Sequence, residues 1–454
     1  MENKMGTKPI PSLLVSMSLP IMISMLVQAL YNIVDSIFVA KLGENALTAV
    51  SLIFPIQNLM IATAAGTGVG MNAILSRCLG AKDTAQANRT AQNGVLLGVL
   101  NFVIFALIGI FFSRTFLYAQ TTDPEISRMG IQYMEIISIF SAGIFLEITF
   151  ERLLQSTGKT FYTMITQGIG AIINIILDPI LIFGYFGFPA LGVSGAAIAT
   201  VFGQFVACGL AIYFNLKKNK EIHLSIKGFR PHKQTIGAIY KIGIPSIVMQ
   251  SIGSIMTFGM NKILLMFSST ATAVFGIYFK LQSFIFMPVF GLNNGMIPII
   301  AYNYGAKKPD RIVKTIKLSV LLSSSLMLIG LVIFQFGTEF LLRTLFFASE
   351  DMVSIGVPAL RIISLSFIFA GFCIITSAVF QALGNGMYAL IVSVIRQLIF
   401  ILPLAFLFSR TLGLHFVWWS FPIAELSSLT FCTLLLRRIY RLKIKPLKSV
   451  SSEH

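Results

Sequence analysis

Long apolar segments are the feature that most limits how this chain can fold. The 454-residue sequence contains about twelve blocks of twenty or more mainly apolar residues, separated by short polar loops. A helix of about 20 apolar residues spans a hydrocarbon core of roughly 30 Å. Because a segment in lipid must satisfy its own backbone polar groups, each block is predicted to be a helix. The expected fold class is an all-α membrane protein with 12 transmembrane helices.

The charge distribution indicates how these helices cross the membrane. The net charge is +17 and only 11% of residues are charged, against roughly 25% in soluble proteins. About 25 Lys and Arg residues lie before the first span and in every second loop, whereas about five lie in the opposite loops. Cytoplasmic loops carry such an excess. The pattern predicts a multi-pass plasma (inner) membrane protein with both termini cytoplasmic, and it removes the reason to expect a nucleic-acid partner.

Several classes of enzyme and cofactor site are not supported by the sequence. No GxxxxGK[ST] loop occurs, which argues against direct ATP hydrolysis. The glycines of Gly66-x-Gly-x-Gly70 lie late in an apolar span with no strand before them, so close helix packing is preferred over dinucleotide binding. The four cysteines form no metal-ligand pattern. We expect no cofactor, no enzymatic activity and a monomer.

An internal repeat defines the domain organisation. A Pro-containing span, a second span and the loop Leu79-Gly-Ala-Lys82 recur about 225 residues later and end in Tyr304-Gly-Ala-Lys307. Gln155-Ser-Thr-Gly158 is likewise echoed by Gln381-Ala-Leu-Gly384. One offset over all six helices predicts two pseudo-symmetric six-helix bundles, with lobes at 1–216 and 237–454 and a basic cytoplasmic linker at 217–236. Parallel halves of this kind are a transporter architecture, in which the substrate path lies between them.

Ionisable residues inside the apolar spans are the candidate functional residues. A charge in hydrocarbon costs from about 2.5 to more than 10 kcal/mol, so its presence needs a reason. Asp35 and Asn32 share one face of the first span, and Asp178 and Asn174 share one face of the fifth. Carboxylate and amide oxygens bind hard cations, and we predict cation coupling there: a proton, or Na⁺ held by Asp35, Asn174 and Asp178. Alternatively, each acid is protonated and only bonds a neighbouring helix.

Two prolines lie on the same helices as these acids. Pro179 cannot donate to the carbonyl of Ile175, which leaves an oxygen free one turn from Asp178. Pro20 similarly permits the first helix to bend. Both are therefore predicted hinge positions.

The motifs quoted above, in their order and in both halves, resemble multidrug and toxic compound extrusion (MATE) transporters over essentially the whole chain. The resemblance is closest to the bacterial branch whose cation site lies in the N-terminal half. It implies that bending of the first helix is coupled to substrate release. The other bacterial branch carries acids in the seventh and tenth helices, where this chain has Lys262 and Arg361. That difference argues against a cation site in the C-terminal half.

Further polar residues are candidates for contact with substrate at the inner mouth. Glu151 matches a position implicated in related drug exporters, and Gln155 follows it in the QSTG motif. An interfacial ion pair with Arg152 is the alternative for Glu151. In the second half, Gln250 and Asn261 belong to one polar face of the seventh span, and uncharged polar groups suit substrate contact without fixing an ion.

The predicted function is secondary active antiport, in which organic cations or drugs leave the cell in exchange for H⁺ or Na⁺. The alternative is a lipid-linked oligosaccharide flippase of the same superfamily, for which Arg361 and Arg396 would supply cations to a pyrophosphate. A major-facilitator transporter is disfavoured because the loop after the second span lacks the Gly-x-x-x-Asp-Arg pattern. A membrane-embedded enzyme is disfavoured by the absence of a His/Asp/Glu cluster.

Overall fold

The computed structural model describes residues 3–225 and 229–447, and every regular element in these ranges is helical. Ten helices are long and apolar enough to cross a membrane, and two bent pairs bring the number to 12 when each pair counts as one span. The predicted all-α membrane fold is confirmed.

The chain forms two compact units. Unit 1 comprises Met1–Lys4 and Ile23–Ile247, and unit 2 comprises Met5–Met22 and Val248–His454. The first long helix, α2 (Ile10–Ala40), and the central helix, α9 (Lys233–Leu265), each contribute residues to both units. The predicted lobes, 1–216 and 237–454, divide the chain in sequence order. The compact units differ from them because unit 2 includes the start of α2 and unit 1 includes the start of α9.

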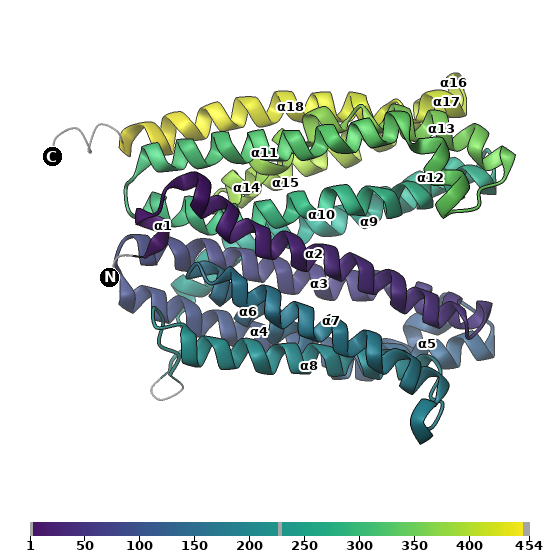
Figure 1. Ribbon diagram of the computed structural model, residues 1–454, viewed down its shortest axis with the longest axis horizontal. Helices are drawn as coiled ribbons and strands as arrows, with labels where there is room; N and C mark the ends of the chain where they lie inside the picture. Colours follow the sequence, from purple (N-terminus) through teal and green to yellow (C-terminus); the bar gives the residue numbers. More distant parts are fainter. Residues whose placement is uncertain (1–2, 226–228, 448–454) are drawn as a thin grey trace. The chain divides into compact units, whose positions relative to one another are not determined.

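Unit 1 is a bundle in which α6 and α7 both pack against α8 (Figure 1). Its remaining elements are α3 (Glu44–Gly80), α4 (Thr84–Tyr118), α5 (Pro124–Ile139), α6 (Ala142–Ser156), α7 (Thr160–Phe183), the 3-10 turn η1 (Tyr185–Gly187) and α8 (Val193–Lys218). Local chemistry places several boundaries. Asp123 caps α5 by accepting from the backbone N–H groups of Glu125 and Ile126 at 2.8 and 3.0 Å, and Gly184 ends α7 in the left-handed conformation that glycine favours.

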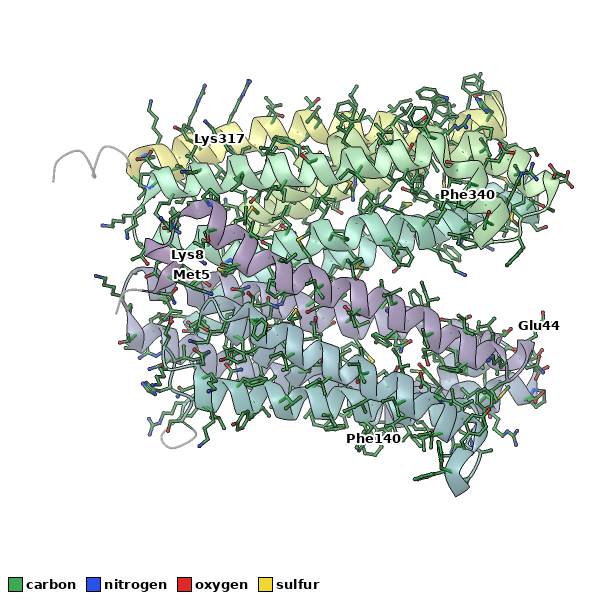
Figure 2. The ribbon with its side chains drawn as sticks, viewed as in Figure 1. Met5, Lys8, Glu44, Phe140, Lys317 and Phe340 are labelled. Carbon is green, nitrogen blue, oxygen red and sulfur yellow. The ribbon has the colours of Figure 1, made fainter. Side chains whose placement is uncertain are left out.

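Unit 2 repeats this arrangement with more breaks. Its elements are α10 (Ser269–Gly305), α11 (Pro309–Phe336), α12 (Thr338–Leu345), α13 (Glu350–Ser364), α14 (Phe367–Ala382), α15 (Gly386–Val394), the π-helical turns η2 (Ile395–Ile401) and η3 (Tyr440–Ile444), α16 (Leu402–Thr411), α17 (Leu414–Val417) and α18 (Ser420–Ile439). An aromatic core that includes Phe275, Tyr278 and Trp418 packs α10 against the later helices. Within this unit, Lys8 and Lys317 lie toward one end of the helices and Phe340 toward the other (Figure 2).

The two units share the same local turns at the repeated motifs. Lys82 and Lys307 both adopt a left-handed backbone, with φ of 59° and 55°. Gly158 and Gly384 do so as well, with φ of 83° and 79°. Each unit also has a bent span at the equivalent place, α5–α6 at 41° and α13–α14 at 50°. The repeat in the sequence is therefore a repeat in backbone geometry.

The glycines of α3 pack against a neighbouring helix, as predicted. A Cβ on Gly66 would lie 2.8 Å from the backbone nitrogen of Ile247, and one on Gly70 would collide with the carbonyl of Ile239. Both partners belong to the part of α9 in unit 1. Only glycine permits this backbone approach.

Candidate cation site in unit 1

Two aspartates of unit 1 face each other inside the bundle. Asp35 projects from α2 and Asp178 from α7, and their side chains lie within hydrogen-bonding reach of each other. Asp178 is fully buried. A hydrogen bond between two carboxyl groups requires a proton on one of them, so the pair carries one negative charge when bonded in this way. The arrangement is an acid pair that can bind a proton or another small cation.

Asn174 and Thr200 complete the polar environment of Asp178. With the Asn174 amide oriented to satisfy its neighbours, its nitrogen donates to Asp178 Oδ2 at 3.3 Å. Its oxygen accepts from the hydroxyl and the backbone N–H of Thr200, at 3.2 and 3.1 Å. Both residues are more than nine-tenths buried. Thr200 on α8 thus fixes the orientation of Asn174, and Asn174 fixes that of Asp178.

One oxygen of the pair remains available. Asp35 Oδ1 is buried and has no hydrogen-bond partner among the described residues. A buried polar atom without a partner costs about 1–3 kcal/mol, so a ligand that supplies positive charge or a donor would relieve that cost. Among the described residues, no three His, Cys, Asp or Glu side chains lie close enough together to hold a metal ion by themselves. A bound metal ion would therefore need amide, hydroxyl or carbonyl oxygens as well as the two carboxylates.

Close packing of α7 against α8 brings Asn174 to Thr200. A Cβ on Gly203 would lie 2.7 Å from the carbonyl oxygen of Gly170, and Gly203 lies one turn after Thr200 on α8. The two backbones can approach only because both positions are glycine. Packing of these helices therefore determines the geometry of the acid pair.

This packing makes Gly203→Ala a specific test. We expect the added methyl to push α8 away from α7 and to destabilise the protein by about 1–3 kcal/mol. Because the Asn174–Thr200 contacts lengthen, transport should fall with it. Gly209→Ala on the same helix is the matched control, since a Cβ there meets no atom within 4 Å. Apparent unfolding midpoints in detergent measure the difference, and equal midpoints for the two variants would contradict this packing.

The other predicted cation-site residues occupy different surroundings. Asn32 lies on the exposed side of α2, and its backbone carbonyl accepts from the Ser36 hydroxyl at 2.8 Å. Pro179 lies inside α7 directly after Asp178, and Pro20 lies inside a continuous α2. The structure therefore brings together Asp35, Asp178 and Asn174, whereas the Asn32 side chain forms no hydrogen bond with them in the described part of the chain.

A second buried acid lies nearer the N-terminal end of α7. Glu151 on α6 is 3% exposed and accepts from the Thr166 hydroxyl at 2.6 Å and from Gln167 Nε2 at 2.7 Å. Arg152, the next residue, donates to Gln155 Oε1 at 2.9 Å. Both carboxylate oxygens of Glu151 thus have uncharged donors on α7, and Gln155 serves as an acceptor for Arg152.

The predicted residues of unit 2 lie on three elements: α9, α13 and η2. Gln250 and Asn261 are half-buried on α9. Arg396 donates to Glu425 Oε2 across 3.4 Å, which identifies the partner of this membrane-embedded arginine. Arg361 is exposed, and its backbone carbonyl accepts from Gln335.

Sequence reasoning missed two hydroxyl residues of unit 1. Thr200 orients Asn174, and Thr166 donates to Glu151. Threonine is common in membrane helices and often bonds its own backbone, so neither position is distinguishable in the sequence. The one available signal is the spacing of Thr166 and Gln167 relative to Asn174, which places them about two turns before it on α7.

Comparison with known proteins agrees with this fold and this arrangement of helices. The MatE family model matches residues 20–180 and 245–407. The multidrug export protein MepA of Staphylococcus aureus (strain MSSA476) is 28% identical over 418 residues, covering 92% of this chain and 91% of its own. MepA of Staphylococcus saprophyticus is also 28% identical, over 420 residues, with 92% and 90% covered.

Solved structures give the same result. One, described as the outward-facing conformation of a multidrug resistance MATE family transporter of the MOP superfamily, has a TM-score of 0.91 at 26% identity and covers 99% of each chain. Another, a MOP superfamily transporter from Pyrococcus furiosus whose binding pocket is described as reversed in polarity, has a TM-score of 0.91 at 25% identity and covers 98% of each.

The fold and these matches define a multi-pass membrane transporter rather than an enzyme. More particularly, the chain belongs to the MatE family, the multidrug and toxic compound extrusion transporters.

Proposed function

We propose that this chain is a secondary active antiporter that exports organic cations across the plasma membrane in exchange for H⁺ or Na⁺. The observation that carries the proposal is the acid pair of Asp35 and Asp178, buried in a membrane-embedded bundle and supplied with a fixed amide by Asn174. Ion binding there neutralises charge that the surrounding hydrocarbon disfavours. The small-molecule substrates of the MepA relatives support the export of organic cations.

The proposed cycle uses the position of the acid pair on two helices. Uptake of the ion from outside neutralises the pair, and α2 and α7 then approach more closely. The change bends α2 at Pro20 and expels the drug, and loss of the ion to the cytoplasm resets the pair. A potential of 100 mV contributes about 2.3 kcal/mol per net charge moved. Exchange of one proton for one monovalent cation moves no net charge, so use of the potential requires two ions.

We also propose that both termini lie in the cytoplasm and that the protein is a monomer. The distribution of Lys and Arg among the loops supports the proposed orientation. Within unit 2, Lys8 and Lys317 belong to the cytoplasmic group and lie toward the end of the helices opposite Phe340 (Figure 2). We expect no cofactor beyond the coupling ion.

The flippase alternative receives less support from the arginines that suggested it. Arg396 is paired with Glu425, so its charge is compensated before any pyrophosphate binds. Glu425 would also oppose an anionic substrate at that place.

The experiment is dye transport into proteoliposomes that contain the purified protein. Ethidium movement is followed with a proton gradient, a sodium gradient, or neither imposed. We expect movement that depends on one of the two gradients, and that gradient identifies the coupling ion. Absence of ethidium movement under both, in vesicles where the protein is folded, would refute drug antiport.

A further inference from the structure

A pocket opens in unit 1 where α4 ends and α5 begins, and neither aspartate of the acid pair lines it. Its volume is about 620 Å³. Residues from both helices and from their connection line it, including Arg114, Tyr118, Thr121, Ser127, Arg128 and Glu135. The proposed transport cycle uses none of these residues.

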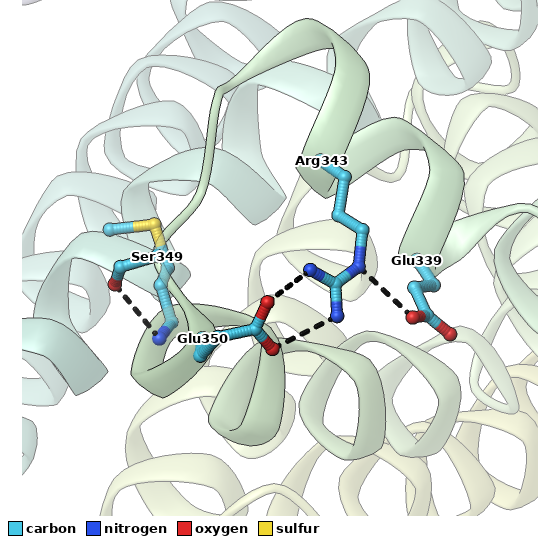
Figure 3. Close-up of polar contacts among 5 residues, drawn as sticks. Glu339, Arg343, Ser349 and Glu350 are labelled. Atoms are coloured by element: carbon cyan, nitrogen blue, oxygen red, sulfur yellow. Dashed lines mark hydrogen bonds and ion pairs between the residues drawn. The ribbon is translucent and has the colours of Figure 1, made fainter.

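Two arginines without partners are the first unusual feature of this pocket. Arg114 comes from α4 and Arg128 from α5, and neither has a hydrogen-bond or ion-pair partner within the described ranges. By contrast, Arg343 on α12 contacts Glu339 at 3.0 Å and both oxygens of Glu350 at 2.6 and 3.0 Å (Figure 3). Both arginines are exposed, and two guanidinium groups that line one pocket can bind the same anion through charge-assisted hydrogen bonds.

Their side of the membrane makes these arginines more unusual. In the orientation proposed above, the outer loops hold only about five Lys and Arg residues, and two of those five line this pocket. The positive-inside bias keeps most Lys and Arg residues out of the outer loops. It therefore does not explain why two of the few outer arginines line the same pocket. A ligand gives such a reason.

A buried hydroxyl without a partner is the second, independent observation. Ser127 lines the same pocket, is 2% exposed, and its Oγ has no hydrogen-bond partner in the part of the chain that the structure describes. It lies in the first turn of α5, where the helix dipole favours negative charge. The Asp123 side chain already accepts from Glu125 and Ile126 there, which leaves the Ser127 hydroxyl as a donor for a ligand oxygen.

The acids near the pocket do not neutralise it. Glu135 lines it, so the two arginines leave a net charge of one positive unit among the lining residues. Glu125 accepts from Asn45 Nδ2 at 2.7 Å, and its side chain does not line the pocket. A singly charged anion matches this balance.

The surface beside the pocket indicates which anion. Phe111 and Phe112 on α4 precede Arg114 and are 68% and 59% exposed, and Leu107 and Ile110 continue this exposed apolar surface. Acyl chains would pack along it. We propose that Arg114, Arg128 and Ser127 bind the phosphodiester headgroup of an anionic phospholipid in the outer leaflet. Such a group carries one negative charge, and guanidinium groups recognise it through paired hydrogen bonds.

The test is ligand-induced thermal stabilisation of the full-length protein in detergent. Three probes are titrated: dioctanoyl phosphatidylglycerol, dioctanoylglycerol, which has the same chains and no phosphate, and inorganic phosphate. Wild type is compared with Arg114→Gln/Arg128→Gln. Arg410→Gln is the matched control, because this outer arginine stacks on Phe406 and lies in unit 2.

We expect phosphatidylglycerol to raise the unfolding midpoint of wild type and of Arg410→Gln, and dioctanoylglycerol to raise neither. The half-saturating concentration should increase at least about tenfold in the double variant, because two charge-assisted contacts are lost. Glu135→Gln should show the opposite change and bind more tightly, which a folding defect would not produce.

Two results would overturn the assignment. Equal responses of wild type and the double variant to phosphatidylglycerol would mean that these arginines do not bind the headgroup. An equal response of wild type to inorganic phosphate would assign the pocket to a free anion rather than a lipid. If the double variant does not fold, the single arginine variants and Glu135→Gln still decide the question. None of these measurements requires drug transport, so failure of the proposed function would not affect them.

Discussion

Ethidium efflux by Asp35→Asn and Asp178→Asn proteins is expected to fall to the level of cells that lack the transporter, at least about tenfold below wild type, which corresponds to about 1.4 kcal/mol or more of lost coupling. Asparagine keeps the size of the aspartate side chain and its ability to form hydrogen bonds. However, its amide cannot exchange a proton, and it offers a cation an oxygen ligand without a negative charge. Since the two carboxyl groups act as a pair, either substitution removes the site. The double variant should therefore be no worse than the single ones.

The same substitutions should leave the fold intact or stabilise it. Replacing one of two facing acids with a neutral amide removes a buried ionisable group, so the apparent unfolding midpoint should stay equal or rise. Loss of efflux with unchanged stability separates a role in coupling from a role in folding. Glu44→Gln is the control, because Glu44 is exposed at the start of α3. Wild-type efflux by both aspartate variants would place the coupling site elsewhere.

The repeat explains why so much of the fold was predictable. The number of membrane spans was predicted from the lengths of the apolar blocks. The division into two six-helix bundles was predicted from one repeat offset of about 225 residues. The offset holds because Lys82 and Lys307 form the same left-handed turn, and so do Gly158 and Gly384. Such turns need specific residues, and their motifs are therefore visible in a sequence.

Other features depend on contacts that no sequence pattern displays. The breaks at Phe140 and Leu365 in the bent spans contain neither proline nor glycine, so apolar length alone predicts one straight span in each place. The hydrogen bond between Thr200 and Asn174 requires α8 to lie against α7, which only the fold establishes. Asp35, Asp178 and Asn174 were identifiable individually because polar groups in hydrocarbon need a reason, whereas their mutual geometry was not.

The π-helical turn in unit 2 is a further example, and it leads to the second large effect. Arg396 lies in η2, where the wider turn changes the direction of successive side chains. Its guanidinium meets Glu425 on α18 at 3.4 Å, and the other oxygen of Glu425 has no partner among the described residues. The sequence alone cannot say whether Glu425 pairs with Lys280, Arg361 or Arg396, which all lie in apolar spans. The structure selects Arg396 because η2 packs against α18.

Removing one member of this pair is expected to destabilise the protein strongly. Glu425→Gln leaves the Arg396 charge uncompensated in the membrane, and breaking a buried ion pair costs about 3–5 kcal/mol. The Arg396 side chain is 29% exposed, so the effect should lie at the lower end of that range.

Substitution of both partners separates stability from function. Arg396→Met/Glu425→Met removes both charges together, and replacement of a buried pair by apolar side chains is often neutral or stabilising. We therefore expect the double variant to recover most of the unfolding midpoint that Glu425→Gln loses. If the pair serves the fold alone, ethidium efflux recovers with the midpoint. A stable double variant without efflux would instead show that Arg396 or Glu425 takes part in transport, and that unit 2 holds more of the mechanism than the acid pair of unit 1 explains.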